Sequence, residues 1–201
     1  MQLAGARFML SAAAARDMPA DIGFEVAFAG RSNAGKSSAL NRLAGQRKLA
    51  RASATPGRTR LVNFFALDTA DGRRLVDLPG YGYARAPRHE RARWAELLER
   101  YLTERRSLTG LVLLVDSRHV LKPEDETLIA WARASALPLL LLLTKADKLG
   151  RGARAQALAR IRPGLAPSET ALVFSALSGL GVETARDWIA ARLENAEAPS
   201  G

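Results

Sequence analysis

Long apolar runs separated by helix-like segments dominate the pattern of this chain. The runs at 24–30, 110–116 and 137–145 are continuous, which is typical of strands covered on both faces of a sheet. A fourth strand is predicted at 171–176. Trp94, Leu97 and Tyr101 recur at the spacing of one apolar helix face. Helices are predicted at 36–45, 88–106, 123–135, 151–161 and 182–194.

One hairpin interrupts this alternation. The segments 61–68 and 74–80 flank "TADGR", whose Asp-Gly pair is a typical hairpin signal. We therefore expect an α/β fold of three layers, with about six mostly parallel strands, one antiparallel edge strand and helices on both faces. Ligands of such folds bind at the carboxyl ends of the strands.

The length of 201 residues suits a single domain. We expect an N-terminal arm or strand at 1–22, the compact domain at 23–195 and a flexible tail at 196–201. No apolar run approaches the roughly 20 residues that span a bilayer, so stable membrane insertion is not expected. The apolar part of the N-terminus is short for an export signal. The chain contains no cysteine, which excludes disulfides and fits the cytoplasm.

The charge of the chain is strongly basic and unevenly distributed. The net charge of +10 suggests a polyanionic partner. No acidic residue occurs between Val26 and Leu67, where the cations are Arg31, Lys36, Arg42, Arg47, Lys48, Arg51, Arg58 and Arg60. Our hypothesis is that the polar loop at 46–60 contacts RNA phosphates. The alternative is a mobile, solvated loop.

A phosphate-binding pattern joins the first predicted strand to the first helix. "GRSNAGKS", Gly30 to Ser37, fits G-x-x-x-x-G-K-[ST]. Glycines let the backbone N–H groups approach phosphate, Lys36 would reach the β- and γ-phosphates, and the Ser37 hydroxyl would bind Mg²⁺. The alternative is a chance match in a glycine-containing turn.

Three further segments follow predicted strands. In "DLPG", Asp77 can hold the outer Mg²⁺ shell and the Gly80 N–H can contact the γ-phosphate, although the pattern is also a good turn. In "TKAD", Asp147 can accept hydrogen bonds from N1–H and the exocyclic amine of guanine, while the Lys145 stem lies over the base. In "FSA", backbone N–H groups can contact the guanine carbonyl oxygen, and Ser175 would stiffen the turn.

The order of these segments favours a GTPase of the Ras-like P-loop class. An ATPase is the main competitor, and "TKAD" argues against it because adenine lacks the amine that Asp147 would recognise.

Longer stretches resemble the EngB (YihA) family of bacterial ribosome-biogenesis GTPases. The resemblance rests on "EVAFAGRSNAGKSS", "TPGRTRLVNFF", "DLPGYGYA" and "LLTKADK", and it extends over nearly the whole chain. It implies a P-loop GTPase fold, GTP and Mg²⁺ binding, a role in large ribosomal subunit assembly, and an effect on cell division and septation. The implied partners are GTP or GDP, the large subunit or its precursor, and ribosomal RNA. We expect the protein to act as a monomer.

Matching the family's motifs to this sequence implies two dozen GTP-binding positions. Lys36, Thr59 and Gly80 take catalytic roles, and Thr59 joins Ser37 in the Mg²⁺ shell. The full set of GTP-binding positions is Gly30, Arg31, Ser32, Asn33, Ala34, Gly35, Lys36, Ser37, Gly57, Arg58, Thr59, Arg60, Leu61, Asp77, Leu78, Pro79, Gly80, Thr144, Lys145, Ala146, Asp147, Phe174, Ser175 and Ala176.

Two positions have open interpretations. Tyr81 stands where Ras-like proteins commonly place a water-positioning glutamine, which predicts slow hydrolysis, on the order of 10⁻⁴ to 10⁻² s⁻¹. Tyr81 is alternatively a packing residue. Asn33 is a candidate K⁺ ligand that would place positive charge near the phosphates, or else an asparagine suited to a turn with positive φ. The functional alternatives are a GTPase acting directly at the septum and a P-loop ATPase unrelated to ribosomes.

Overall fold

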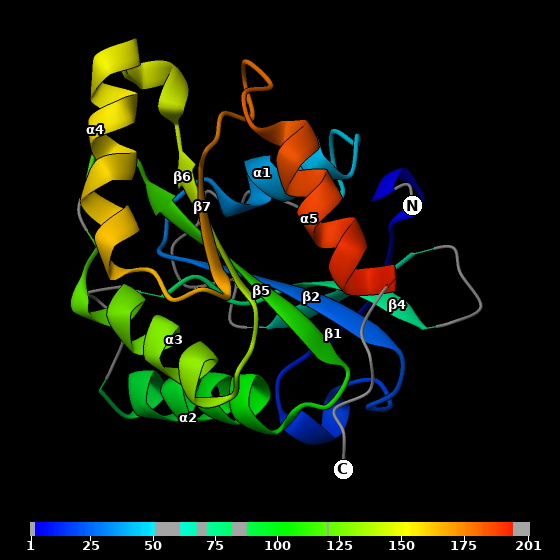
Figure 1. Ribbon diagram of the computed structural model, residues 1–201. Coiled ribbons are helices and arrows are strands. Elements are labelled where there is room, and N and C mark those ends of the chain that lie inside the picture. The colour runs from blue at the N-terminus through cyan, green and yellow to red at the C-terminus, as the bar shows by residue number, and fades with distance from the viewer. Residues whose placement is uncertain (1–2, 51–60, 68–71, 82–87, 120, 195–201) are drawn as a thin grey trace.

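The computed structural model describes residues 3–50, 61–67, 72–81, 88–119 and 121–194, without the side chains of 88–91. Seven strands form one sheet in the order β1-β3-β4-β2-β5-β6-β7 (Figure 1). The strands are β1 (Arg7–Ala12), β2 (Phe24–Gly30), β3 (Val62–Ala66), β4 (Arg73–Asp77), β5 (Leu108–Asp116), β6 (Leu139–Thr144) and β7 (Glu169–Val173). The helices are α1 (Lys36–Leu43), α2 (Arg88–Glu104), α3 (Pro123–Ala134), α4 (Arg151–Ile161) and α5 (Val182–Glu194), with short 3₁₀ turns at Leu3–Gly5, Ala15–Asp17, Ala146–Lys148 and Arg162–Gly164.

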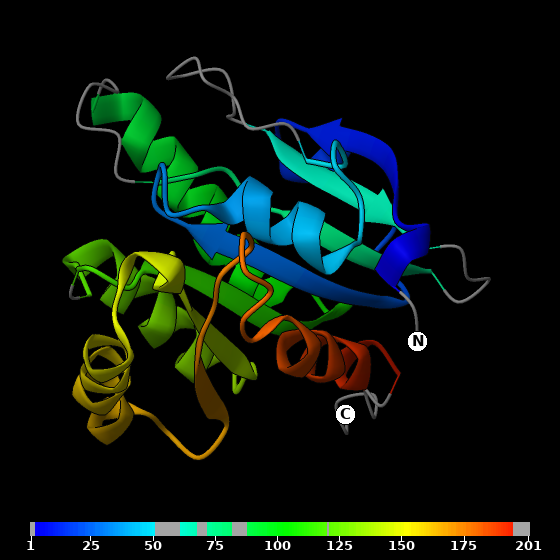
Figure 2. The same ribbon diagram turned by 90° about the horizontal axis from the view of Figure 1, so that it is seen from above.

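Helices cover both faces of this sheet. α1 and α5 lie side by side on one face, where Leu40, Leu43 and Ile189 join the buried cluster (Figures 1 and 2). On the other face, α2 and α3 contribute Leu98 and Leu128 to a second cluster, and α4 packs against the same cluster with half-buried side chains. The predicted three-layer α/β fold is confirmed.

Complete burial explains the continuous apolar runs of the central strands. Every residue of β6 is buried, and β5 pairs in parallel with both β2 and β6. Such a strand has no solvent-facing side, so polar alternation is absent.

Within the described residues, no helix has the length and apolar character needed to cross a membrane.

The sheet differs from the prediction in the number of its strands and in its edge. The structure has seven strands instead of about six, and the antiparallel strand β3 is not the edge. β1 pairs antiparallel with β3 on its outer side, so β3 lies between β1 and β4. Most side chains of β1 are exposed, among them Phe8 and Met9, and buried and exposed positions do not alternate along it. The sequence pattern therefore predicts either an arm or a strand for this segment.

A buried carboxylate anchors α2 at the end of the sheet opposite the phosphate loop. Glu25, the second residue of β2, is fully buried and accepts hydrogen bonds from Arg74 Nε (2.8 Å), Tyr101 Oη (2.8 Å) and Arg105 Nε (2.7 Å). Burial and the neighbouring carboxylate raise the pKa of Tyr101. A buried carboxylate with this many donors is well compensated, so α2 is held firmly at its C-terminal end.

Candidate nucleotide-binding site

The predicted phosphate loop links β2 to α1 through a tight turn. Asn33 and Gly35 both have positive φ, +64° and +92°. Gly30 touches the neighbouring strand so closely that a Cβ there would lie 2.9 Å from the Leu114 carbonyl oxygen. The two glycines are therefore required by the backbone conformation of the loop. In this conformation, successive N–H groups at the start of α1 can form an anion-binding cradle.

The "DLPG" segment is joined to this loop by backbone hydrogen bonds. The Ser32 N–H donates to the Tyr81 carbonyl oxygen (3.0 Å), and the Tyr81 N–H donates to the Gly30 carbonyl oxygen (3.4 Å). Gly80 consequently lies against the loop, and a Cβ on it would be 3.5 Å from Ser32 N. The structure thus brings the phosphate loop and "DLPG" together, although α1 and the β3–β4 hairpin separate them in the sequence.

Lys36 and Asp77 form a buried ion pair. The Lys36 ammonium donates to Asp77 Oδ1, and the two residues are 9% and 4% exposed. A charge at this depth requires a partner, and these two groups neutralise each other. The pair lies at the carboxyl ends of β2 and β4, where a phosphate with its metal ion would meet both side chains.

The base-recognition segments also converge. Ser175 is fully buried and its hydroxyl donates to Asp147 Oδ1 (2.7 Å). This hydrogen bond lowers the pKa of Asp147, so the carboxylate is ionised at neutral pH. The Ser178 N–H donates to Ser175 Oγ (3.1 Å) and orients the hydroxyl. Asp147 is therefore a fixed, charged acceptor of the kind that the N1–H and amine of guanine require.

"TKAD" is clamped onto the phosphate loop by its first two residues. The Thr144 hydroxyl donates to the Ala34 carbonyl oxygen (2.6 Å). Lys145 has φ +57°, and its ammonium donates to the Asn33 carbonyl oxygen (2.7 Å). The phosphate and base segments thus form one continuous site.

Asp116 is a site residue that the sequence interpretation missed. It ends β5, and its carboxylate pairs with the Lys145 ammonium (2.9 Å). The Arg118 guanidinium, bonded to both carboxylate oxygens, keeps the pKa of Asp116 well below its ordinary value. An aspartate at the end of the apolar run 110–116 was the available signal, because that run ends at the same edge of the sheet.

"FSA" is described in the structure, whereas most of the predicted segment 57–61 is not. Phe174 is buried, its N–H donates to the Leu143 carbonyl oxygen (2.8 Å), and its own carbonyl oxygen accepts from the Ala146 N–H (3.1 Å). This places "FSA" beside "TKAD". Gly57, Arg58, Thr59 and Arg60 lie outside the described residues.

The Tyr81 side chain packs against α2 and α3. It is 5% exposed, its hydroxyl donates to Asp125 Oδ1 on α3 (2.5 Å), and its ring packs near Trp94. Burial raises the pKa of Tyr81, so the phenol stays protonated. This geometry supports the packing interpretation of Tyr81, and it leaves the hydroxyl engaged away from the phosphates.

Replacing Tyr81 by Phe is expected to destabilise the protein and to leave GTP turnover unchanged. Asp125 Oδ1 would lose its buried donor, which costs about 1–3 kcal/mol. Urea unfolding and steady-state phosphate release measure the two effects separately. A large fall in turnover at unchanged stability would show that the hydroxyl acts on the reaction.

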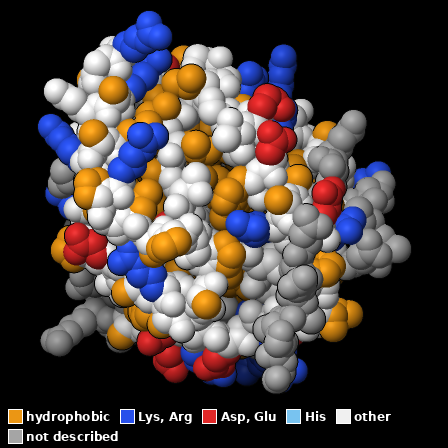
Figure 3. Space-filling view, viewed as in Figure 1, with side chains coloured by type: hydrophobic (Ala, Val, Ile, Leu, Met, Phe, Trp, Pro, Cys, Tyr) orange, Lys and Arg blue, Asp and Glu red, His pale blue; other side chains and the backbone are white. Residues whose placement is uncertain are grey.

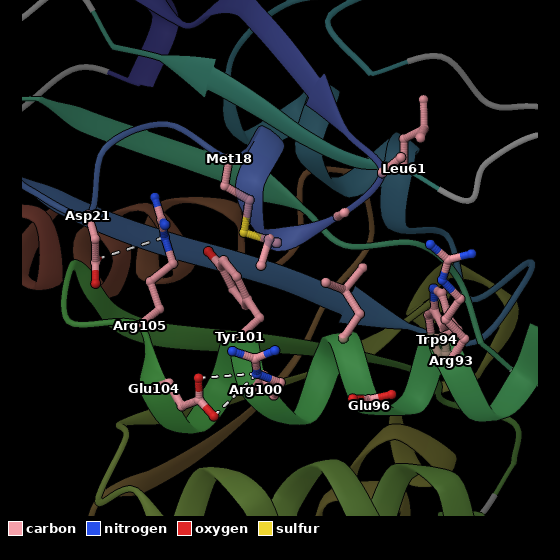
Figure 4. A pocket seen from close by; sticks show the side chains of 14 residues that line it. Met18, Asp21, Leu61, Arg93, Trp94, Glu96, Arg100, Tyr101, Glu104 and Arg105 are labelled. Carbon is pink, nitrogen blue, oxygen red and sulfur yellow. Dashed lines mark hydrogen bonds and ion pairs between the residues drawn. The ribbon is translucent and has the colours of Figure 1, made fainter.

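A cavity of about 650 Å³ lies beside α2, away from the base segments (Figure 4). Of the predicted residues, Leu61 lines it, together with Met18, Trp94 and Tyr101. Two pairs of its charged side chains interact, Arg100 with Glu104 and Arg105 with Asp21, as Figure 4 shows. No residue of the phosphate loop, of "DLPG", of "TKAD" or of "FSA" lines the cavity, so it is not the nucleotide site.

The described residues contain no cluster of three or more His, Cys, Asp or Glu that would hold a metal by themselves. A site made of the Ser37 hydroxyl and the Asp77 carboxylate suits Mg²⁺, which keeps several waters and is usually shared with substrate phosphates. The oxygen donors present thus fit Mg²⁺ bound together with a nucleotide.

Comparisons with known proteins relate the chain to GTP-binding proteins. A family model described as "50S ribosome-binding GTPase" matches residues 25–145. The "Probable GTP-binding protein EngB" of Edwardsiella ictaluri is 53% identical over 183 residues, covering 90% of this chain and 83% of that protein. The protein of the same name from Pectobacterium carotovorum is 51% identical over 198 residues, covering 95% and 92%.

Solved structures show the same fold. A crystal structure of a probable GTP-binding protein EngB has a TM-score of 0.65 at 23% identity, covering 84% of this chain and 98% of that one. Era, solved with MgGDPNP and nucleotides of 16S ribosomal RNA, has a TM-score of 0.64 at 20% identity, covering 90% of this chain and 60% of that one. With a family model over more than half of its length and relatives above 50% identity over most of both chains, this chain belongs to the EngB family of GTP-binding proteins.

Proposed function

We propose that this protein binds GTP with Mg²⁺, hydrolyses it slowly and acts as a nucleotide-dependent switch in large ribosomal subunit assembly. The observation that carries the proposal is the joining of Lys36, Asp77 and Asp147 into one site at the carboxyl ends of the strands. The family model's description supports the ribosomal role. Effects on cell division and septation would follow from that role in the cytoplasm, with the protein acting as a monomer.

The proposed mechanism assigns one task to each part of the site. Backbone N–H groups of the phosphate loop and the Lys36 ammonium hold the phosphates, and Asp147 selects guanine. Ser37, Thr59 and the outer-shell Asp77 would hold Mg²⁺, which when bound neutralises charge that develops on the phosphates. Hydrolysis is slow because Tyr81 is turned into the core, so no side chain at that position orients water.

The switch is proposed to lie at the junction of Gly80 with the phosphate loop. The Gly80 N–H is the group that would contact a γ-phosphate. The Tyr81 backbone is hydrogen-bonded to Ser32 and to Gly30. A shift of Gly80 toward the phosphate would therefore change both of these hydrogen bonds to the loop. Loss of the γ-phosphate would release that contact.

One basic surface, around α4, supports a nucleic-acid partner. Figure 3 shows Lys and Arg side chains over the region where Figure 1 places α4. α4 has no buried residue, and the span 148–168 contains cations but no acid. Arginine-rich surfaces of this kind bind phosphate backbones in a salt-dependent way. We also propose RNA contact for the loop at 46–60, of which residues 51–60 lie outside the described residues.

Co-sedimentation with large ribosomal subunits tests the proposed function. Protein loaded with a non-hydrolysable GTP analogue is expected to bind more tightly than GDP-loaded protein at every salt concentration, with both affinities falling as salt rises. Equal binding of the two forms across the salt series would contradict the switch.

We further propose that K⁺ stimulates hydrolysis through Asn33. The side chain of Asn33 is exposed at the loop, while its positive φ equally suits the turn. A cation there would offset charge in the transition state and raise turnover roughly tenfold or more in KCl over NaCl at equal ionic strength. Equal rates in the two salts, or an Asn33→Ala variant that keeps the response, would rule the proposal out.

A further inference from the structure

A row of polar side chains crosses the edge of the sheet and ends at Asp77. Ser11 on β1 is directly opposite Asn63 on β3, and Asn63 is directly opposite Asp77 on β4. The Ser11 hydroxyl donates to Asn63 Oδ1 (2.6 Å), and Asn63 Nδ2 donates to Asp77 Oδ2 (3.4 Å). The row therefore connects the N-terminal strand with the carboxylate beside the phosphate loop.

Asn63 is unusual for its place in the sheet. Asparagine is depleted in strands, where its amide gains little from packing. Its neighbours Val62, Phe64 and Phe65 are buried apolar side chains, while Asn63 is only half-buried. Packing alone would favour a β-branched or apolar residue at this position, so the amide calls for another explanation.

The two oxygens of the Asp77 carboxylate are held from opposite sides. Oδ1 accepts from the Lys36 ammonium, and Oδ2 faces the Asn63 amide. Because the Ser11 hydroxyl occupies Asn63 Oδ1, the NH₂ group of that amide is the end turned toward Asp77. The contact of 3.4 Å is longer than a typical N–H···O hydrogen bond and is therefore a weak one.

We propose that Asn63 is a positioning residue for the Mg²⁺ shell, acting through Asp77, and that Ser11 makes β1 part of the nucleotide site. This inference rests on the proposed function. Groups that hydrogen-bond to a metal's carboxylate partner fix its orientation and its basicity. Since the Asn63 amide is uncharged, it fixes Oδ2 without neutralising Asp77, and Oδ1 would be left to help hold Mg²⁺ once Lys36 turns to phosphate.

The test measures binding of a fluorescent GDP as a function of free Mg²⁺, and again in excess EDTA. In Asn63→Ala, the Mg²⁺ concentration for half-maximal effect is expected to rise roughly tenfold, at the lower end of what outer-shell partners contribute. GDP affinity in EDTA is expected to stay that of the wild type. A purely structural role of Asn63 would not move the Mg²⁺ dependence alone.

Two further variants and one control secure the interpretation. Asn63→Leu keeps the shape of the side chain and the strand, and it is expected to behave like Asn63→Ala. Ser11→Ala is expected to shift the Mg²⁺ dependence in the same direction by less, because Ser11 is exposed. Thr170→Ala truncates a half-buried polar side chain of β7, away from Asp77, and should change nothing.

Two results would overturn the inference. Unchanged Mg²⁺ dependence in both Asn63 variants would exclude the positioning role, and an equal loss of GDP affinity in EDTA would place the effect on the nucleotide or the fold. Failure of the proposed function is distinguishable, because then wild-type protein itself would show no Mg²⁺-dependent GDP binding, and this inference would fall with it.

Discussion

Replacing Asp147 by Asn is expected to lower GTP affinity by roughly 10²- to 10⁴-fold and to make xanthosine triphosphate the better ligand. Two hydrogen bonds to an ionised group contribute about 1.5–3 kcal/mol each, and every 1.4 kcal/mol is about tenfold. The Asn amide would meet the N1–H and amine of guanine with one acceptor and one donor. Xanthine carries a carbonyl where guanine has its amine, so it restores the pairing.

The fold should tolerate this change. The Asn oxygen can still accept the Ser175 hydroxyl that now bonds to Asp147 Oδ1. Asp187→Asn removes the same charge from an exposed position on α5 and serves as the matched control. Competition titrations with GTP, ATP and xanthosine triphosphate measure the result, and an unchanged GTP affinity would refute the role of Asp147 in base recognition.

Replacing Lys36 by Met is expected to weaken GTP binding by about 2–5 kcal/mol, or roughly 30- to 5,000-fold. The ammonium is the only side-chain cation among the described residues that pairs with Asp77. The same substitution removes the partner of a carboxylate that is 4% exposed. Breaking a buried ion pair typically destabilises a protein by about 3–5 kcal/mol, so unfolding in urea should occur at a lower concentration.

A double variant separates binding from stability. In Lys36→Met/Asp77→Asn the uncompensated charge is gone, so much of the stability should return while GTP binding remains lost. Lys48→Met, at an exposed position, is the matched control for the loss of one lysine. Recovery of GTP affinity in the double variant would contradict a direct contact between Lys36 and the phosphates.

The sequence alone determined the elements and the order of the binding motifs. The phosphate loop and its strand–helix setting depend on residues consecutive in the chain, and local backbone preferences decide them. The continuous runs of β2, β5 and β6 likewise follow from burial on both faces. β1 could not be predicted as firmly, because its side chains are mostly exposed and do not alternate between buried and exposed positions.

Only the tertiary structure decided which side chains meet. The Tyr81 hydroxyl bonds to Asp125, 44 positions away, and this contact turns the phenol from the phosphates into the core. Strand pairing places Asp116 beside Lys145 and Asn63 beside Asp77. Periodicity predicts the face of a strand on which a residue lies, but partners across strands depend on register between distant segments, which no local pattern encodes.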